Sequence, residues 1–452
     1  MTPFKFYLIT DTHYFAKELG CCGEEYDNFM QYEQKCFAET EAINKAAFKW
    51  LAEAKDADTV LIAGDLSFNG EPESHQGFIK LLKKLKASGK RIYVITAGHD
   101  FNEKCFAFDE TGRKEFPGTK REELFDLYYE FGFSDAISVH KESLSYVAQL
   151  SDGVRLLALN NDGDGVNKKT YTVSQIEWIL KETEKARNEG QMMFVMNHYP
   201  LIPACPIFGF IGDAVMPNAD NITSMLADEG VHLGFTGHMH NQSIKMKLSE
   251  KGNRFWDVCT GSLIGCPAFM RLVEIKDKAT VDIKSIPVPD FDLDTDGLTT
   301  EEYFKRQFDM MINTYLDCMA DDPERLMRKL RLPKNDALKS ILEFFGKSLN
   351  TATIGSLCKK LFVKCDDSIK DRPLREFLTE IVRNVFIGNA PYVLGTPEYD
   401  AVMGILDRFS PILLVVSKTV KVGGQPLDIK DIVKNSIGHY GVDEYNTVLY
   451  LE

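Results

Sequence analysis

Residues 4–13 read FKFYLITDTH, a short apolar run that ends in Asp11 and His13. Residues 59–65 read TVLIAGD, in which a second apolar run ends in Asp65. A continuous apolar run of this length, bounded by turn residues, is typical of a strand buried in a parallel sheet. The sequence therefore predicts buried strands that place carboxylates and an imidazole just past their carboxyl ends.

Three further apolar runs end in polar clusters, and each cluster contains histidine. The run 91–96 precedes Gly98-His99-Asp100, the run 192–196 precedes Asn197-His198, and the run 232–236 precedes Gly237-His238-Met239-His240. Ligands bind at the carboxyl edge of strands in open α/β sheets. A single histidine at a strand end is more often structural than a ligand, but five clusters in this order are hard to obtain by chance. We expect them to meet at one rim.

The pattern between these runs indicates the fold class. Helical periodicity appears at 37–54, 76–87, 122–132 and 174–187, where Ser174 and Glu177 resemble a capping box. Alternation of strand and helix predicts crossover connections and a buried sheet. Runs at 243–248, 254–259, 271–275 and 280–285 then follow one another without helices, and 143–149 with 154–159 resembles a hairpin. The sequence predicts an α/β (α+β) sandwich of two sheets with helices outside.

A second region follows an acidic, turn-rich segment at 287–297 that is typical of a linker. Beyond it the periodicity is helical at 300–319, 337–349, 354–362 and 374–386, and 447–451 could add a short strand. We therefore predict one domain over residues 1–290 and a second, mainly helical domain over residues 298–452.

Charge and apolar runs limit the partners. The 452 residues include 53 Lys and Arg against 67 Asp and Glu, a formal net charge of −14. Such a chain repels phosphate backbones, so we expect no nucleic-acid polymer as a partner. No apolar run is long enough to span a bilayer, which predicts no membrane association. The run before Asp11 is too short for a signal peptide and the ten cysteines lack zinc-finger spacing, so we expect a cytoplasmic protein with reduced thiols.

The residue types at the strand ends suit a metal centre. Imidazole and carboxylate ligands bind Mn, Fe, Zn or Ni, and one carboxylate can bridge two ions. Two ions about 3.5–4 Å apart can hold a hydroxide between them and clamp a phosphate in line with it. The sequence has no Gly-x-Ser-x-Gly elbow, phosphate-binding loop or dinucleotide fingerprint that would indicate another chemistry.

These five clusters resemble the five sequence blocks of the calcineurin-like metallophosphoesterases, over roughly residues 4–285. More loosely, the helical extension is similar to that of bacterial cyclic-nucleotide phosphodiesterase-like members. The resemblance implies a four-layer α/β/β/α metallophosphoesterase sandwich with a C-terminal, mainly helical domain. It also implies two divalent metal ions and a metal-bound hydroxide as the nucleophile.

The same resemblance implies residue roles. The first ion would be bound by Asp11, His13 and His240, the second by His198 and His238, and Asp65 would bridge them. His99 would protonate the leaving oxygen, and Asp100 would orient its ring. Asn197 would pack or contact the substrate region and would not be a ligand.

One position departs from the family pattern. Gly98 stands where the family has an asparagine that ligates the second ion, so one of four protein ligands is missing. Water could take the place, Asn161 or Asn102 could swing in, or the second ion could be weak and the activity low or altered. Since His99 and Asp100 are kept, the sequence predicts a working enzyme with a weakened second metal site.

The leading functional hypothesis is a phosphodiesterase that acts on a small, nucleotide-like phosphorylated substrate. The alternatives are a phosphomonoesterase, including a phosphoprotein phosphatase, and a non-catalytic binding scaffold with a degenerate site, which only Gly98 supports. Residues 18–34 are a candidate lid over the rim, and residues 102–119 are candidates to line the substrate cleft. His75, His140, His232 and His439 have no matching partners and are expected to be structural or surface residues. The sequence makes no prediction of the oligomeric state.

Overall fold

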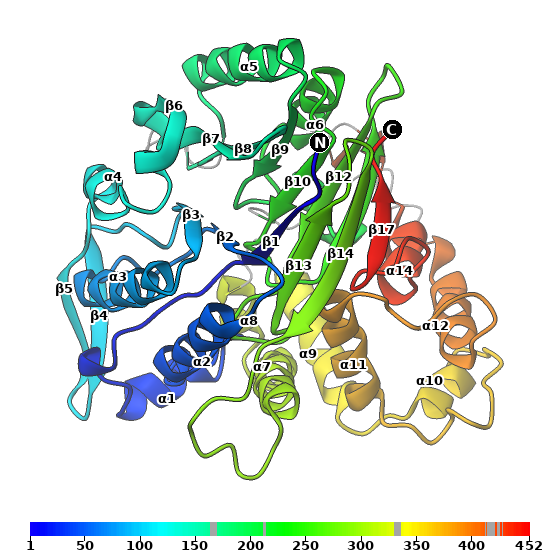
Figure 1. The fold of residues 1–452 in the computed structure, drawn as a ribbon. Helices are drawn as coiled ribbons and strands as arrows, with labels where there is room; N and C mark the ends of the chain where they lie inside the picture. Colours follow the sequence, from blue (N-terminus) through cyan, green and yellow to red (C-terminus); the bar gives the residue numbers. More distant parts are fainter. Residues whose placement is uncertain are drawn as a thin grey trace.

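The protein is described by a computed structural model that covers residues 1–162, 170–210, 214–329, 336–411, 413, 421–422, 425–426 and 428–452. Within these residues the chain folds around two β-sheets (Figure 1). The first has the strand order β17-β14-β13-β1-β2-β3. Its strands are β1 (Phe4–Ile9), β2 (Thr59–Ala63), β3 (Arg91–Ile95), β13 (Phe269–Ile275), β14 (Thr280–Pro287) and β17 (Thr447–Tyr450). β1, β2 and β3 are parallel, whereas β13, β14 and β17 extend the sheet with antiparallel pairs.

The second sheet has the strand order β11-β12-β10-β9-β8-β7-β6. Its strands are β6 (Ala136–His140), β7 (Ser145–Ser151), β8 (Val154–Ala158), β9 (Met192–Met196), β10 (Leu233–Thr236), β11 (Ser243–Leu248) and β12 (Arg254–Cys259). The central strands β8, β9, β10 and β12 are parallel. The predicted hairpin is present as the antiparallel pair β7–β8.

Aromatic side chains join the two sheets. The ring of Phe6 on β1 stacks on Phe194 of β9, with 5.3 Å between ring centroids, and meets Phe235 of β10 edge-on at 5.3 Å. All three rings are fully buried. Such pairs add about 0.5–1.5 kcal/mol each beyond the burial of their area. The strands that carry the polar clusters are therefore fixed against one another from inside.

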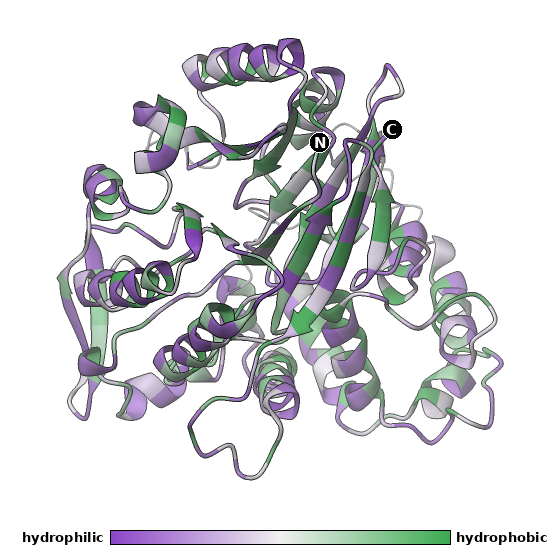
Figure 2. Ribbon diagram, viewed as in Figure 1, coloured by the Kyte–Doolittle hydropathy of each residue, from purple (hydrophilic) through white to green (hydrophobic). Residues whose placement is uncertain are grey.

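Helices cover the outer faces of both sheets. α2 (Thr40–Glu53) and α3 (Pro72–Ala87) lie on the first sheet, where Trp50 meets Tyr7 of β1 edge-on at 5.5 Å. α5 (Val173–Asn188) and α6 (Ala219–Asp228) lie against the second. Hydrophobic residues run along the strands, whereas α3 and α5 carry many hydrophilic ones (Figure 2). The predicted four-layer α/β/β/α sandwich is confirmed.

Two helix predictions need correction. α5 begins at Val173, and its cap is the Thr172 side chain, which accepts a hydrogen bond from the Gln175 amide; Ser174 lies inside the helix. The helix predicted at 122–132 is reduced to a 3-10 turn, η2 (Arg121–Glu123), and one turn of helix, α4 (Leu124–Leu127). The chain leaves the helix there because the Phe131 carbonyl accepts a hydrogen bond from the Val94 amide of β3.

The segments beside the rim have structure that sequence periodicity did not predict. β4 (Lys104–Asp109) and β5 (Gly112–Pro117) form a hairpin, and η1 (Lys17–Leu19) and α1 (Glu24–Met30) lie beside it. They enclose an aromatic cluster of Phe15, Phe37, Phe68 and Phe108. The candidate lid and the candidate cleft segment are therefore packed against one another. Shorter 3-10 turns occur at η3 (Phe133–Asp135), η4 (Lys141–Ser143) and η5 (Pro206–Phe210).

The C-terminal region is mainly helical, as predicted. Its elements are α7 (Thr300–Asp321), α8 (Pro323–Lys329), α9 (Asp336–Leu349), α10 (Ile354–Lys360), α11 (Leu374–Ile387), α12 (Pro397–Arg408), β15 (Lys421–Val422), β16 (Gln425–Pro426) and α14 (Ile429–Ile437). Phe304 and Phe308 of α7 belong to the same buried core as the first sheet. β17 then returns to that sheet and pairs with β14. The division of the chain at residues 290–298 stays a prediction.

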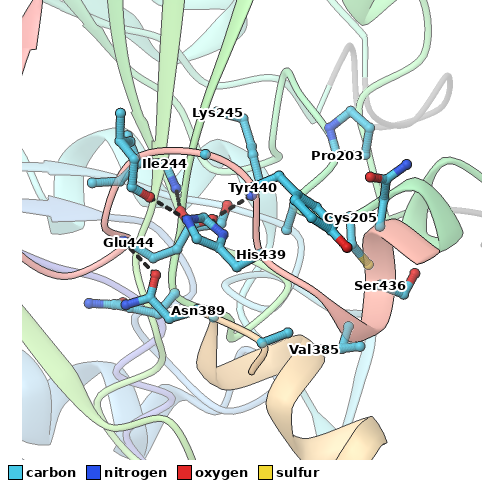
Figure 3. A pocket seen from close by; sticks show the side chains of 18 of the residues that line it. Pro203, Cys205, Ile244, Lys245, Val385, Asn389, Ser436, His439, Tyr440 and Glu444 are labelled. Atoms are coloured by element: carbon cyan, nitrogen blue, oxygen red, sulfur yellow. Dashed lines mark hydrogen bonds and ion pairs between the residues drawn. The ribbon is translucent and has the colours of Figure 1, made fainter. Parts of the chain in front are cut away.

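A buried carboxylate ties the C-terminal segment to the second sheet. Glu444 accepts hydrogen bonds from the Ile244 amide and from Lys245 of β11, and it lies 3.2 Å from Nδ1 of His439 (Figure 3). A cavity of about 620 Å³ lies beside this cluster, between β11 and the C-terminal helices. His439 therefore has a structural partner that sequence spacing did not reveal. Across the described ranges of the chain, no helix is both long and apolar enough to cross a bilayer.

Candidate metal centre

The polar clusters lie at the carboxyl ends of parallel strands of the two sheets. Asp11 and His13 follow β1, Asp65 follows β2, and His99 with Asp100 follows β3. From the second sheet, His198 follows β9, and His238 with His240 follows β10. Because the sheets pack face to face through Phe6, Phe194 and Phe235, these ends meet at one rim.

Asp11, His13 and His240 form one compact group. Their candidate ligand atoms lie within 4.8 Å of one another, and all three residues are buried. Nε2 of His240 lies 3.2 Å from Oδ1 of Asp11 and 3.0 Å from Nε2 of His13. This is the set of residues that the family resemblance assigns to the first ion.

Asp65, His198 and His238 form a second group with the same spacing. Nε2 of His198 lies 3.0 Å from Oδ2 of Asp65, and Nε2 of His13 lies 3.7 Å from the same oxygen. Asp65 therefore lies between the two groups, as a bridging carboxylate must.

Buried atoms in both groups lack good hydrogen-bond partners and are suited to bind a cation. Asp11 Oδ1 and His198 Nε2 are buried and make no hydrogen bond of acceptable geometry to any described residue. Two imidazole nitrogens 3.0 Å apart, those of His13 and His240, compete for a single proton. An unsatisfied buried polar atom costs about 1–3 kcal/mol. A bound divalent ion would satisfy these atoms at once, so the residues fit the metal ions that the resemblance implies.

The backbone at the rim is strained. Among the non-glycine residues with positive φ are five of the six proposed ligands: Asp11 (52°), His13 (35°), Asp65 (51°), His238 (69°) and His240 (50°). Asp and His tolerate this region better than most residues, but such strain still costs about 1 kcal/mol or more per position. Left-handed residues directly after the strands turn the side chains back toward the rim, and clustered strain of this kind is typical of a functional site.

Gly64 leaves the space that the His198 ring occupies. Its φ is +90°, and a Cβ there would lie 2.7 Å from Nδ1 of His198, so only glycine fits. Nδ1 of His198 lies 2.8 Å from the Ala63 carbonyl, to which it donates. This bond fixes the tautomer and leaves Nε2 as the ring atom that faces Asp65.

The groups are strongly polarised before any ion binds. Burial opposes ionisation of Asp11, but the imidazoles of His240 and His198 outweigh it and hold the pKa of Asp11 well below its usual range. Burial likewise opposes the charge on His198, yet Asp65 and Asp11 raise its pKa to about 9. A divalent ion must therefore displace a proton from His198 when it binds.

His99 is held differently from the prediction. Its backbone amide donates to Oδ1 of Asp65 at 3.1 Å, and Nδ1 of its ring donates to the Phe68 carbonyl at 2.7 Å. The carboxylate of Asp100 instead accepts from the Leu66, Ser67 and Ala97 amides, each at 2.8 Å. Asp100 thus fixes the turns after β2 and β3, and the expectation that it orients the His99 ring is wrong.

His75 supports the same turn and was not predicted to have a partner. It is buried, with Nε2 at 2.9 Å from the Asp100 carbonyl and Nδ1 at 2.7 Å from the Tyr128 hydroxyl. Burial lowers its pKa to about 4, so the ring is neutral at pH 7. It lies in the first turn of α3, outside every block, and its position in the sequence gave no signal of this role.

Lys35 is a cation near the rim that no motif pointed to. Its side chain is largely buried, and Nζ lies 4.6 Å from the ring centroid of Phe68, which in turn lies 6.5 Å from the ring of His99. Burial lowers the pKa of His99 to about 4, and the charge of Lys35 adds to that shift against the opposing charge of Asp65. Lys35 also lies 3.8 Å from Oε2 of Glu33, and it contributes positive potential beside the His99 ring.

The two asparagines proposed to replace the missing amide have different surroundings. Nδ2 of Asn102 donates to Oδ1 of Asn69, and the residue is exposed. Asn161 is buried, and its Nδ2 has no hydrogen-bond partner among the described residues. Asn197 packs inward, where it accepts from the Tyr171 hydroxyl and donates to the Tyr199 carbonyl.

Asp257 of β12 anchors the chain that follows His198. Oδ2 accepts hydrogen bonds from the Leu201 amide at 2.6 Å and the Ile202 amide at 2.8 Å, and Oδ1 accepts from the Thr236 hydroxyl at 2.7 Å. Burial raises the pKa of Asp257 to about 6, and these hydrogen bonds only partly offset it. A group with a raised folded-state pKa destabilises the fold once pH rises above its unfolded-state value.

We expect this carboxyl to lower the free energy of unfolding by about 3 kcal/mol between pH 4 and pH 8. Asp257→Asn should remove that part of the decline, because an amide can still accept from both backbone N–H groups and donate to Thr236. Urea unfolding at both pH values measures it, with Asp292→Asn, an exposed acid, as the control. An identical decline in Asp257→Asn and in the unchanged protein would contradict the assignment.

Sequence comparison agrees with this geometry. The model of the calcineurin-like phosphoesterase family matches residues 4–242, more than half of the chain. The chain belongs to the calcineurin-like phosphoesterase family. It is therefore a metal-dependent phosphoester hydrolase, and the Asp and His groups at the rim are those able to bind its ions. No curated protein matches the sequence.

Solved structures resemble this calcineurin-like phosphoesterase at low identity. A dimetal phosphatase from Danio rerio is 13% identical, with a TM-score of 0.46, over 64% of this chain and 97% of its own. The purple acid phosphatase PPD1 from yellow lupin is 14% identical, with a TM-score of 0.40, over 65% of this chain and 53% of its own. A 5'-nucleotidase precursor from Thermus thermophilus is 10% identical, with a TM-score of 0.37, over 78% and 60%.

Proposed function

We propose that this phosphoesterase is a phosphodiesterase acting on a small, nucleotide-like substrate, with two divalent ions drawn from Mn, Fe, Zn or Ni. The observation that supports it most is the pair of ligand groups joined through Asp65, with His99 directly beside them. A cytoplasmic location, a small phosphorylated molecule as partner, and the absence of nucleic-acid and membrane partners stay predictions of the sequence.

The residues at the rim would bind the two ions, and the turns that carry them fix where the ions lie. Asp11, His13 and His240 would hold one ion, His198 and His238 the other, and Asp65 both. When bound, the ions supply positive charge to the phosphate and activate a water for attack. The left-handed turns after β1, β2 and β10 fix these side chains before substrate arrives, so little reorganisation is needed in the transition state.

His99 is placed to act on the leaving group. Its main-chain amide is bonded to Asp65 and its Nδ1 to the Phe68 carbonyl, so the ring has one orientation relative to the ligand groups. Nε2 is the remaining ring nitrogen. Because the pKa of His99 is lowered to about 4, Nε2 carries no proton at pH 7. It would first take up a proton, which the negative charge of a bound phosphate favours, and would then pass it to the leaving oxygen. Asp100 and His75 position this residue through the turn that carries it.

The segments around the rim favour a small substrate over a protein. The side-chain amide of Gln34 donates to the Cys266 carbonyl at 2.9 Å. The backbone of Lys35 pairs with that of Gly265 in an isolated antiparallel β-bridge. The segment before α2 is thereby fastened to the loop that follows β12. A phosphoprotein would need an open groove, whereas these contacts hold the segment beside the rim, where Gln34 lies 3.5 Å from the His240 carbonyl.

Hydrolysis of bis-p-nitrophenyl phosphate and of p-nitrophenyl phosphate, each with added Mn²⁺, tests the proposal. We expect the diester to have the higher kcat/KM. A preference for the monoester would replace the proposal with a phosphomonoesterase. Failure to hydrolyse either compound with two ions bound would favour the binding scaffold.

Lys35→Met tests the added cation. We expect kcat/KM for phosphoesters to fall about tenfold or more, equivalent to about 1.4 kcal/mol, because positive potential at the phosphate is lost. Metal content should stay the same, since Lys35 is not a ligand. Lys45→Met, which removes a lysine exposed on α2, serves as the control. An unchanged kcat/KM in Lys35→Met would remove Lys35 from the site.

A further inference from the structure

Gly98 leaves the second ligand group one side chain short, and its backbone does not explain why. Its φ is not among the positive values, so any residue could adopt the conformation. What stands in the way is another side chain. A Cβ built on Gly98 would lie 3.0 Å from the hydroxyl oxygen of Tyr199, closer than a Cβ usually approaches an oxygen. The space next to Gly98 is therefore held by a phenol oxygen.

Tyr199 lies against the second ligand group. Its ring centroid is 4.1 Å from that of His238 and 5.3 Å from that of His198. The residue is 5% exposed. The phenol thus shares one pocket with two imidazoles of the group, on the side where Gly98 offers no side chain.

The chain around Tyr199 is fixed on both sides. Asn197 donates to the Tyr199 carbonyl at 2.6 Å and is itself held by the Tyr171 hydroxyl at 3.0 Å. Two residues after Tyr199, the Leu201 amide donates a hydrogen bond to Oδ2 of Asp257. The backbone that carries Tyr199 is therefore fixed on both sides by buried side chains. A phenol oxygen can bind a divalent ion and can donate a hydrogen bond to a phosphate, the two capacities that an asparagine amide would have supplied.

We propose that the Tyr199 hydroxyl replaces the side chain missing at Gly98 and is an oxygen ligand of the second ion. The inference rests on the proposed function for the presence of two ions. With it, the second site has the donor set Asp65, His198, His238 and Tyr199, and the weakness expected from Gly98 does not follow.

Metal binding without substrate tests the proposal. Mn²⁺ and Zn²⁺ titrations by calorimetry, with metal content measured after dialysis, should show two ions in the unchanged protein. Tyr199→Phe should weaken the second ion at least tenfold and leave the first within twofold. Tyr7→Phe, which removes a hydroxyl remote from the rim, should bind both ions normally. Two ions held with unchanged affinity by Tyr199→Phe would overturn the proposal, as would a single ion in the unchanged protein.

A rescue makes the test specific. Gly98→Asn alone should weaken the second ion, because its Cβ crowds the Tyr199 oxygen. Gly98→Asn combined with Tyr199→Phe removes that oxygen and supplies an amide, so it should restore the affinity. Tighter binding in Gly98→Asn alone, or no recovery in the double variant, would overturn the proposal. A protein that binds two ions through Tyr199 yet hydrolyses no phosphoester would instead disprove the proposed function and leave this inference standing.

Discussion

Replacing His99 with alanine is expected to reduce kcat for phosphoester hydrolysis about a hundredfold or more while two ions stay bound. A general acid contributes roughly 10²–10⁴ to a rate, and His99 is the imidazole fixed beside the bridging Asp65 through the Phe68 carbonyl. The variant keeps the main-chain amide that donates to Asp65, so the carboxylate loses no partner. Steady-state kinetics and metal content measured on one preparation give both results.

The structure also allows His99 to be a metal ligand, and the same experiment distinguishes this role from that of a general acid. His13, Asp65 and His99 also form a group with ligand atoms within 4.8 Å of one another. If His99 were a ligand, His99→Ala would lose an ion as well as activity. His140→Ala, an imidazole that interacts with Ser143 at the far end of β6, serves as the control and should change neither value. Activity that survives His99→Ala would remove the residue from the mechanism.

Replacing Asp65 with asparagine should have the largest effect of any single substitution. Asp65 lies between the two ligand groups, near both His198 and His13, so one change should weaken both ions. We expect kcat/KM to fall by about a thousandfold or more, since metal charge at the phosphate is worth several kcal/mol. Asparagine keeps the size of the side chain and an oxygen for the His99 amide, which limits damage to the fold.

Metal titration and thermal unfolding together separate a loss of metal binding from damage to the fold. Asp65→Asn should unfold at a temperature close to that of the metal-free, unchanged protein. Added Mn²⁺ should raise that unfolding temperature only slightly. Asp58→Asn, an exposed acid just before β2, should behave like the unchanged protein. If Asp65→Asn kept one ion at full affinity, Asp65 would belong to one group only and would not be a bridge.

The fold was largely predictable because its strands are buried on both faces. Such strands read as unbroken apolar runs, and β2 and β9 begin and end where the sequence placed them. The bounds of β11 and β12 also match, although these strands carry charged residues and are partly exposed. The β4–β5 hairpin was missed because its strands are charged and half exposed, and their packing on Phe29 and Phe68 comes from distant segments.

The site was predictable as a set of residue types after strands, but not as contacts. Spacing could not show that Asp100 binds backbone amides, or that the carbonyl beside the His99 ring belongs to Phe68. Nor could it bring Tyr199 to Gly98, since the two meet only when β3 and β9 lie in facing sheets. Lys35 was missed for the same reason.

The register of β17 also sets an order of assembly during synthesis. Thr280 on β14 pairs with Tyr450, so the whole helical region must leave the ribosome before that side of the first sheet is covered. Until then β14 presents an open edge to other nascent chains, which is a route to aggregation. Truncation before Thr447 would make that exposure permanent, even though every residue of the metal centre would be present.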